Sequence, residues 1–399
     1  MLSRLARKIL EMASDDRDYV TDLVQRLIRI PSTSGHEQEV AAMIRQDLEK
    51  IRPDEVFVDS IGNVIGRFGT GSRLIVYDSH MDTVGVGDPA TWRHDPFAAA
   101  EEGGVIFGRG ASDNKAGLGC MLGALRILVG LAEEGDFTLY VVGIVQEEEC
   151  EGLALSVFLE EHDIRPECVV LGECTDLGIN RGHRGRAEIE VVTRGRSCHA
   201  SAPDRGVNAI YKMAPIIDGV RWLNDRLADH PFLGKGTIAP TSIECSTPSR
   251  NALPDQCKVY LDRRMVPSDT RTSIAREIDE IGKFAKAEVR LTGYEKASYT
   301  GLEIGRERFF PAWVLDEASP VLVKARQAYE TLFDRPAHIG KWDFSTDGTY
   351  SMGVKSIPTI GFGPGEERHT HSAEDQVRTE DLWKAAAFYA FFPFVYSTG

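Results

Sequence analysis

Residues 77–87 read YDSHMDTVGVG and follow the apolar run LIV at 74–76, which predicts a buried strand. Side chains two positions apart on a strand point the same way, so His80 and Asp82 both point beyond its carboxyl end. Open α/β sheets bind their ligands at that edge. This stretch therefore predicts an α/β fold with a functional site where the strand ends.

Strand and helix patterns alternate along the first part of the chain. The predicted elements are a helix over 36–51, strands at 56–58, 64–68 and 74–77, a long helix over about 115–134, the strand FTLYVVGIV, a helix near 152–162 and the strand CVVL at 168–171. This order is typical of a sheet with helices on both faces.

A second pattern begins near residue 181, where RAEIEVVTRG alternates polar and apolar residues. Helices near 207–228 and 273–285 and the strands TIAPTSIECST, CKVYLDRRM and AEVRLTG complete a β-α-β-β-α-β order. The predicted helix ASPVLVKARQAYETLF and the predicted buried strand SIPTIGFG then resume the helix and strand pattern of the first part of the chain. We therefore expect a discontinuous α/β domain, residues 1–182 and 298–399, with a ferredoxin-like α+β domain inserted at 183–297.

Charge, cysteine spacing and apolar content argue against several kinds of binding partner and structural feature. The net charge of -15, from 46 basic and 61 acidic residues, argues against nucleic acid and anionic membranes, which need a basic surface. The seven cysteines show no C-x-x-C spacing, so we expect neither a disulfide framework nor a thiolate zinc site. The longest apolar stretch, 116–131, is too short to span a bilayer, and the charged N-terminal segment does not resemble a secretory signal. We expect a cytoplasmic protein.

Acidic and histidine residues follow several of the predicted strands. Alone, a histidine at a strand end is more often structural, and an acidic run is usually a solvated face or a helix start. Here, however, several strand ends meet at one edge, and burying so many carboxylates without a countercharge would be very unfavourable. The residues concerned are His80, Asp82, Asp113, Glu147, Glu148, Glu173 and His371. They predict a bound cation.

Imidazole and carboxylate ligands without thiolate suit Zn²⁺, with Co²⁺ or Mn²⁺ as alternatives. Even the two histidines with only three of these five carboxylates are more ligands than one tetrahedral ion needs. Two ions about 3.5 to 4 Å apart, sharing a carboxylate, would use all of them.

Seven motifs then carry a family resemblance. They are HMDTV (80–84), GRGASDNKAG (108–117), QEE (146–148), GECT (172–175), NALPD (251–255), DRRMVP (262–267) and GPGEERHTHS (363–372). In this order, from about residue 15 to the C-terminus, the chain resembles the acetylornithine deacetylase and succinyl-diaminopimelate desuccinylase family of di-metal peptidases and deacylases. QEEE and FSTDGTY are similar to a branch labelled as selenium-metabolism hydrolases.

The resemblance implies a ligand set for each ion. One ion takes His80, Asp113 and Glu173, and the other takes Asp113, Glu148 and His371. Asp82 would hold the His80 ring from behind, as carboxylates behind metal-binding histidines do. The resemblance also implies a cis peptide bond after Asp113.

Three positions either depart from the family pattern or leave a choice within it. Glu147 is the expected general base, although a shift of one residue would make Glu148 the base and Glu149 the ligand. Cys174 stands where the family usually has proline. The last ligand could be His369 or His371, and the small and acidic residues that follow favour His371.

By resemblance, the larger domain is a zinc-peptidase-like catalytic domain, and the inserted segment is its lid or dimerisation domain and supplies three further candidates. His199 would reach the partner subunit's site and stabilise the oxyanion, while Asn251 and Arg264 would bind substrate. A guanidinium can bind a carboxylate through two hydrogen bonds. Without the resemblance, His199 would be read as a surface-turn residue and Arg264 as a structural ion-pair partner.

The residues and the resemblance together predict a cytosolic, homodimeric di-zinc amidohydrolase. We expect a metal-bridged water to attack the amide bond of an N-acyl amino acid or small peptide with a free carboxylate. The alternatives are a ureidohydrolase acting on N-carbamoyl amino acids and a metal-binding scaffold without turnover. The intact Glu147 argues against the scaffold, because a pure binding site needs no base.

Overall fold

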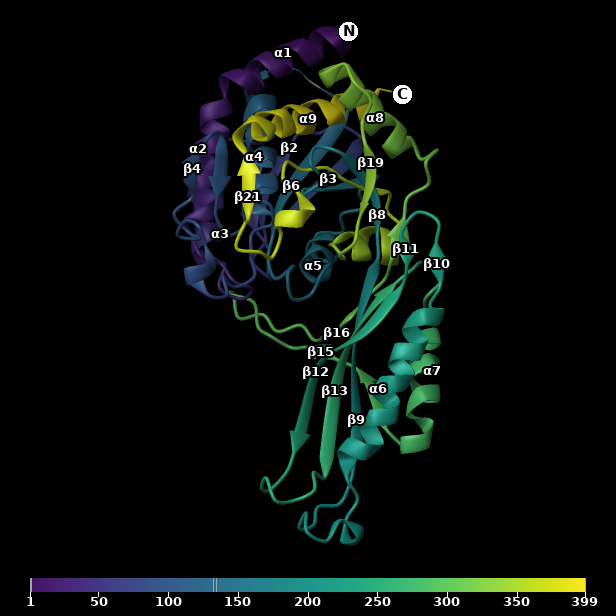
Figure 1. The fold of residues 1–399 in the computed structure, drawn as a ribbon. Coiled ribbons are helices and arrows are strands. Elements are labelled where there is room, and N and C mark those ends of the chain that lie inside the picture. Colours follow the sequence, from purple (N-terminus) through teal and green to yellow (C-terminus); the bar gives the residue numbers. More distant parts are fainter. Residues whose placement is uncertain (1, 132, 134, 399) are drawn as a thin grey trace.

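The computed structural model describes residues 2–131, 133 and 135–398, which form two lobes with separate hydrophobic cores (Figure 1). The larger lobe holds both ends of the chain and a nine-stranded sheet of order β1-β2-β6-β3-β7-β20-β8-β18, with β19 beside β8. Its strands are β1 Glu55–Val58, β2 Val64–Phe68, β3 Arg73–His80, β6 Phe137–Ile144, β7 Cys168–Leu171, β8 Ile179–His183, β18 Trp313–Val314, β19 Ile339–Trp342 and β20 Thr359–Gly361.

The centre of this sheet is parallel. Strand β3 lies between β6 and β7 and runs parallel to both, and β20 runs parallel to β7. The carboxyl ends of these four strands therefore meet at one edge of the sheet. The predicted α/β class is confirmed.

Helices cover both faces of the sheet. A side chain at Gly143 of β6 would contact Leu118 of α4 (Lys115–Leu131), whereas the Tyr140 ring packs on Phe158 of α5 (Leu153–Glu161). Positions 140 and 143 face opposite sides of a strand, so α4 and α5 lie on opposite faces. The remaining helices of this lobe are α1 Leu2–Asp15, α2 Arg17–Ile28, α3 Gln38–Ile51, α8 Pro320–Phe333 and α9 Thr379–Ser397.

Helix α4 is described over a shorter range than the sequence pattern predicts. Its last described residue, Leu131, is buried, and Glu133 is not helical. Residues 132 and 134, which the expected helix over 115–134 includes, lie outside the described residues.

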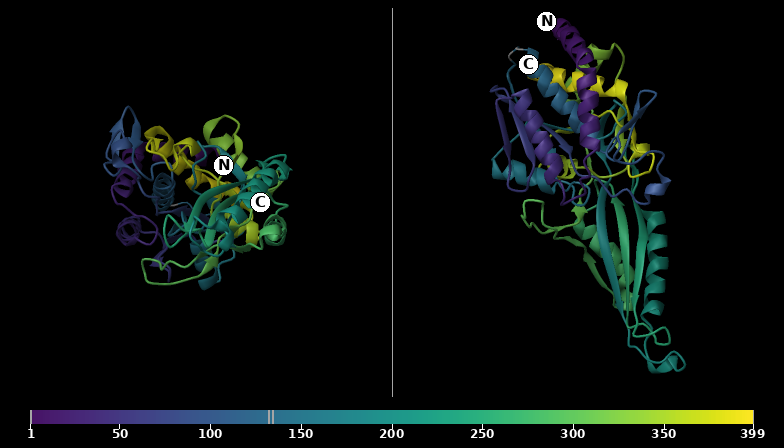
Figure 2. Two further views of the ribbon diagram at one scale, coloured as in Figure 1. Left: turned by 60° about the horizontal axis from the view of Figure 1, so that its bottom comes forward. Right: turned by 90° about the vertical axis from the view of Figure 1, so that its left-hand side faces the viewer.

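The smaller lobe is the expected ferredoxin-like insertion (Figure 2). Its antiparallel sheet has the order β12-β13-β9-β14, and β17 (Phe309–Phe310) also pairs with β9. The chain order of the elements is β9 Gly185–Arg194, α6 Ala209–Arg226, β12 Thr237–Ser246, β13 Gln256–Met265, α7 Arg271–Gly282 and β14 Glu288–Leu291. This is the predicted β-α-β-β-α-β arrangement.

The chain passes between the two sheets twice. The first passage falls between β8 and β9, next to the expected boundary at residue 182. The second comes after β17, which still pairs in the small sheet beyond residue 297. The division into 1–182, 183–297 and 298–399 stays a prediction.

Candidate metal centre

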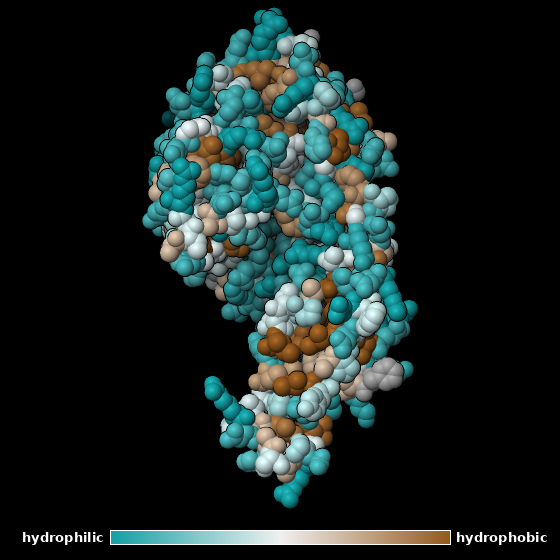
Figure 3. Space-filling model, viewed as in Figure 1, coloured by the Kyte–Doolittle hydropathy of each residue, from teal (hydrophilic) through white to brown (hydrophobic). Residues whose placement is uncertain are grey.

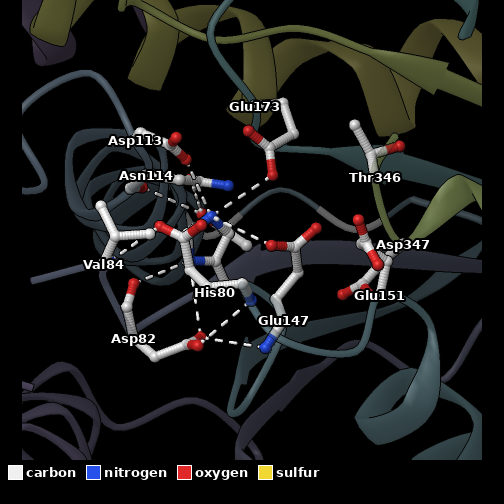
Figure 4. A network of polar contacts seen from close by, with 12 residues as sticks. His80, Asp82, Val84, Asp113, Asn114, Glu147, Glu151, Glu173, Thr346 and Asp347 are labelled. Carbon is white, nitrogen blue, oxygen red and sulfur yellow. Dashed lines mark hydrogen bonds and ion pairs between the residues drawn. The ribbon is translucent and has the colours of Figure 1, made fainter. Parts of the chain in front are cut away.

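The predicted ligands come from loops at one edge of the large sheet (Figure 4). His80 is the last residue of β3, Glu147 and Glu148 follow β6, and Glu173 follows β7. Asp113 comes just before α4, and His371 comes from the loop after β20. Parallel packing of β3, β6, β7 and β20 thus brings together residues that are nearly 300 positions apart in the sequence.

Asp113 lies between the two imidazoles. Its Oδ1 is 3.0 Å from Nε2 of His80, and its Oδ2 is 3.2 Å from Nε2 of His371. Glu173 Oε1 is 3.4 Å from the His80 nitrogen, and Glu148 Oε2 is 2.9 Å from the His371 nitrogen. Because both imidazoles contact one carboxylate, two adjacent ions could share it. The peptide bond from Asp113 to Asn114 is cis, as the resemblance implies.

Of the two C-terminal histidines, His371 is the one at this centre. Its backbone is left-handed, with φ of 55°, and its Nε2 faces Asp113 and Glu148. The His369 ring is buried elsewhere and lies against the side-chain amide of Gln376, with 2.9 Å between the two Nε2 atoms.

The run Glu147–Glu149 forms a turn, not the start of a helix. Helix α5 begins only at Leu153, so a helix dipole does not explain these glutamates. The turn is instead held by Asp82, whose carboxylate accepts hydrogen bonds from the backbone N–H groups of Glu147 at 3.1 Å and Glu148 at 3.2 Å.

Asp82 contacts the His80 ring mainly through its backbone. The His80 Nδ1 lies 2.8 Å from the carbonyl oxygen of Asp82 and 3.6 Å from its carboxylate. The carbonyl therefore keeps the proton on Nδ1 and leaves Nε2 free to face Asp113 and Glu173. Ser34, which the sequence analysis missed, donates to the Asp82 carboxylate at 2.6 Å.

The three glutamates of the turn point to different surroundings. Glu147 is 6% exposed, and its Oε2 lies 3.8 Å from Nε2 of His80. Glu148 contacts His371, as described above. Glu149 forms ion pairs with Lys296 and, at 3.6 Å, with Arg308, so its carboxylate faces away from the centre.

Negative charge is concentrated at this centre. Burial raises the pKa of Glu147 well above its usual value, and nearby Asp347 and Glu173 raise it further while His80 lowers it. Burial and the Asp113 carboxylate raise the pKa of Glu148 to about 7. Hydrogen bonds that the His371 ring donates to Asp113 and Glu148 raise the pKa of His371 to about 10. The positive charge near these carboxylates is therefore too small to offset their burial and mutual repulsion.

These residues fit divalent cations. Two sets of three residues each place their potential ligand atoms within 4.8 Å of one another. The first set is His80, Glu147 and Glu173, and the second is His80, Asp113 and Glu148. Among the described residues, Glu173 Oε2 is buried without a hydrogen-bond partner. Imidazole nitrogens and carboxylate oxygens are the donors that Zn²⁺ accepts in catalytic sites. The site can hold a metal pair, and its expected ligand roles stay predictions.

The centre opens into a cavity that residues of the inserted domain also line. The cavity is lined by Asp113, Glu147, Glu148, Glu151, Glu173, Arg186, Arg264, Phe344, Ser345, Thr370 and His371. Arg264 of β13 pairs in register with Arg186 of β9, so two guanidinium groups enter from neighbouring strands. The cavity therefore combines a carboxylate-rich floor with a cationic wall.

Both arginines already have protein partners. Arg264 binds Asp262 through Nε at 2.9 Å and Nη2 at 3.1 Å. Arg186 binds Glu151 at 2.7 Å, and Ser345 donates to the same carboxylate at 2.6 Å. The sequence analysis missed Arg186 and Glu151. The acidic run at 147–151 contains Glu151, but the register of β9 on β13 was needed to find Arg186.

His199 and Asn251 lie away from this cavity. Both are exposed, and the turn between β12 and β13 carries Asn251 and, next to it, Ala252, which bridges to His199. Arg264 and this turn lie at opposite ends of β13, which runs from Gln256 to Met265, and the turn lies at the tip of the inserted domain beside the loop between β9 and α6 (Figure 1). Within one chain, therefore, the structure does not bring His199 and Asn251 to the predicted ligands.

Comparisons with known proteins fit this geometry. Residues 76–393 match the model of peptidase family M20/M25/M40. The chain belongs to the M20 family. It is 41% identical over 387 residues to the uncharacterized protein YgeY of Escherichia coli (strain K12), with 96% of each chain covered. It is 28% identical over 390 residues to a succinyl-diaminopimelate desuccinylase of Cereibacter sphaeroides, covering 92% of this chain and 96% of the relative.

A solved structure shows the same fold. The M20 protein superposes on a dinuclear metal-binding peptidase of this family from Bacillus subtilis, the YXEP protein, with a TM-score of 0.70 and 16% identity, covering 96% of this chain and 99% of the other. The chain is thus a metal-dependent amidohydrolase or peptidase with a candidate metal site. Within the described residues, none of its helices combines the length and hydropathy of a membrane span.

Proposed function

We propose that this M20 hydrolase uses two Zn²⁺ ions to cleave the amide bond of an N-acyl amino acid or small peptide that has a free carboxylate. The observation that carries the proposal is that one cavity holds both Asp113, in contact with two imidazoles, and the guanidinium of Arg264. Asp113 is suited to be a ligand shared by two metal ions, and the Arg264 guanidinium is suited to bind an anion.

The roles of the acidic residues follow from their contacts. When bound, a pair of divalent ions supplies Lewis acidity and lowers the pKa of water. Glu147 lies beside the ligands and is held by the Asp82 hydrogen bond to its backbone. We assign to it the transfer of a proton from the attacking water to the leaving amine nitrogen. A carboxylate whose pKa is raised by burial holds the transferred proton more readily than an ordinary glutamate does, as a general acid–base group requires.

Arg264 is the proposed binding group for the substrate carboxylate. Asp262 engages its Nε and Nη2 and so fixes the plane of the guanidinium. Nη1 then remains for the substrate. This arrangement selects substrates with a negative charge next to the scissile amide over substrates with a free amine there.

We further propose a homodimer through the inserted domain, in which His199 of the partner subunit stabilises the oxyanion and the partner's Asn251 contacts the substrate. Strand β12 is an edge strand with unpaired backbone groups. Tyr211 and Trp222 of α6 are 78% and 64% exposed and are 11 positions apart, on one helix face. Ile243 of β12 is 55% exposed, and hydrophobic atoms reach the surface of this lobe (Figure 3).

A cytoplasmic location is also part of the proposal. All seven cysteines are free thiols, and the chain carries a net charge of -15. Unpaired cysteines are typical of reducing compartments.

The test combines metal analysis with a substrate panel. The purified protein should contain two equivalents of metal per chain and hydrolyse N-acetyl or N-succinyl amino acids with a much lower KM than their carboxamide analogues. Preference for N-carbamoyl amino acids would establish the ureidohydrolase instead. Full metal content without hydrolysis of any N-acyl or N-carbamoyl amino acid or dipeptide would support the alternative of a metal-binding scaffold without turnover.

A further inference from the structure

Two cysteines face each other near the tip of the inserted domain. Cys245 of β12 and Cys257 of β13 are direct partners in the antiparallel register, and their Sγ atoms are 3.2 Å apart. Both are free thiols. The neighbouring pairs, Glu244 with Lys258 and Ser246 with Gln256, keep the same register, so the two thiols are held together by regular strand pairing.

The backbone of this pair already suits a covalent bond between the two sulfur atoms. Directly opposed residues of antiparallel strands have Cα atoms about 4.5 to 5.5 Å apart. Disulfides span Cα atoms about 4.4 to 6.8 Å apart. A bond between Cys245 and Cys257 therefore requires rotation of the side chains and no displacement of either strand.

The two thiols differ in access. Cys245 is exposed on the edge strand, whereas Cys257 is buried in the core of the inserted domain. Burial and the adjacent Cys245 thiol raise the pKa of Cys257 to about 12. In a chain whose β12 edge is not covered by a partner subunit, an oxidant from solution therefore meets Cys245 first, and Cys257 is placed to react second.

We propose that Cys245 and Cys257 form a redox modification site that closes to an intramolecular disulfide in the presence of a low-molecular-weight disulfide such as oxidised glutathione. Cys245 attacks one sulfur of oxidised glutathione, forms a mixed disulfide and releases one reduced glutathione. Cys257 then attacks the Cys245 sulfur and releases the second. The two thiols are oxidised, the glutathione disulfide is reduced, and both protons leave on the two glutathione thiols.

The bond would constrain the tip of the domain. It would close a ring around the turn between β12 and β13, which carries Asn251. The same turn holds the segment of His199, because Leu253 donates its N–H to Cys198 at 2.9 Å and Ala200 donates to Asn251 at 2.7 Å. This consequence for His199 and Asn251 matters for catalysis only if the proposed function holds; formation of the bond does not depend on it.

Peptide mapping tests the bond directly. Trypsin cuts after Lys235, Arg250 and Lys258, so Cys245 and Cys257 fall in separate peptides, 236–250 and 251–258. After treatment with oxidised glutathione, alkylation and digestion without reductant, we expect these two peptides to be joined. The protein should remain monomeric on a denaturing gel without reductant, and dithiothreitol should release both peptides.

Matched variants separate the proposal from other thiol chemistry. Cys198→Ser should still give the joined peptides, whereas Cys245→Ser, at an exposed edge position, should not. Glutathione retained on Cys245, a Cys245 disulfide between two chains, or no reaction would each overturn the proposal. Hydrogen exchange of residues 246–256 should slow in the oxidised protein, and unchanged exchange would remove the proposed constraint on the tip.

Discussion

Asp375 accepts a hydrogen bond from the backbone N–H of Ser112 at 2.7 Å. The same carboxylate accepts from Gly110 N–H at 2.8 Å and from Arg109 at 3.1 Å. Ser112 directly precedes Asp113, and Asp375 comes four residues after His371. One buried carboxylate thus ties together the two loops whose side chains meet at the centre, although it touches neither ligand.

Replacing this carboxylate should weaken metal binding. In Asp375→Asn, one of the backbone N–H groups would face an amide N–H₂ instead of an oxygen. Substitutions of groups that orient ligands typically cost about 10- to 100-fold in metal affinity. Chelator competition measures the change, circular dichroism checks the fold, and exposed Glu374→Gln is the matched control. Equal affinity in both variants would show that Asp375 does not position Asp113 or His371.

Glu147→Gln should retain the metals and lose turnover. Glutamine keeps the shape of the side chain but cannot accept the proton, and general acid–base groups contribute about 10²- to 10⁴-fold to rates. The measurements are metal content and kcat on the best substrate. Glu149→Gln is the control, because Glu149 pairs with Lys296 outside the centre and should change kcat little. Normal turnover in Glu147→Gln together with loss of turnover in Glu149→Gln would show that Glu147 is not the base and that the base lies later in the run.

Metal binding should release protons and strengthen as the pH rises. In the metal-free protein the pKa of His371 is raised to about 10, so the ring is protonated at neutral pH and must lose its proton to bind a metal. Calorimetric titration of Zn²⁺ at pH 7.5 in buffers of different ionisation enthalpy measures the released protons. His371→Ala should release fewer. An identical proton count in both proteins would contradict the raised pKa.

The same shift predicts the sign of a stability change in the metal-free protein. A histidine whose pKa is raised in the folded state stabilises the fold fully below its unfolded value of about 6.5. That contribution is lost as the pH rises through about 10. Urea unfolding at pH 6 and pH 10 should therefore show a smaller difference in His371→Ala than in the wild-type protein.

Subunit mixing tests whether His199 acts in the partner's site. His199→Ala and Glu147→Gln should each be nearly inactive alone. In a mixed dimer, one site would receive an intact Glu147 and an intact partner His199, so random reassortment should restore about a quarter of wild-type activity. No recovery after verified subunit exchange would place His199 outside the catalytic step.

Arg264→Ala should raise KM for substrates with a free carboxylate by about 10- to 100-fold, as expected for loss of a hydrogen bond to a charged group. Amidated analogues should show no such change. Asp262→Asn is a useful companion, because Asp262 binds two guanidinium nitrogens of Arg264 and sets its orientation. Equal KM changes for both substrate classes would remove the proposed recognition of the carboxylate.

Much of the fold could be predicted because local patterns determine it. The apolar runs at 74–76 and 168–171 become β3 and β7, and the alternating segment RAEIEVVTRG becomes β9. The Glu147–Glu149 turn could not be predicted in this way. The turn depends on hydrogen bonds that its backbone N–H groups donate to Asp82, which comes 65 residues earlier than Glu147, and no local spacing reveals such a contact.

The candidate centre was predictable where its residues follow strands, as His80 and Glu173 do. Residues that act through tertiary contacts were not. Arg186 and Glu151 meet only because β9 packs against the end of the glutamate turn, and Asp375 is recognisable only once its loop lies on Ser112. Their sequence neighbourhoods look like ordinary charged surface.

His371 lies far along the chain from His80, yet both imidazoles contact Asp113. During synthesis, β3, α4, β6 and β7 can form before the segment with His371 has emerged from the ribosome. A bound metal pair would then be acquired late, after the C-terminal loop has docked. Cells short of the metal would accumulate a finished but less stable protein, because an ion that binds only the native state stabilises it by about 2.7 kcal/mol at 100 times its dissociation constant.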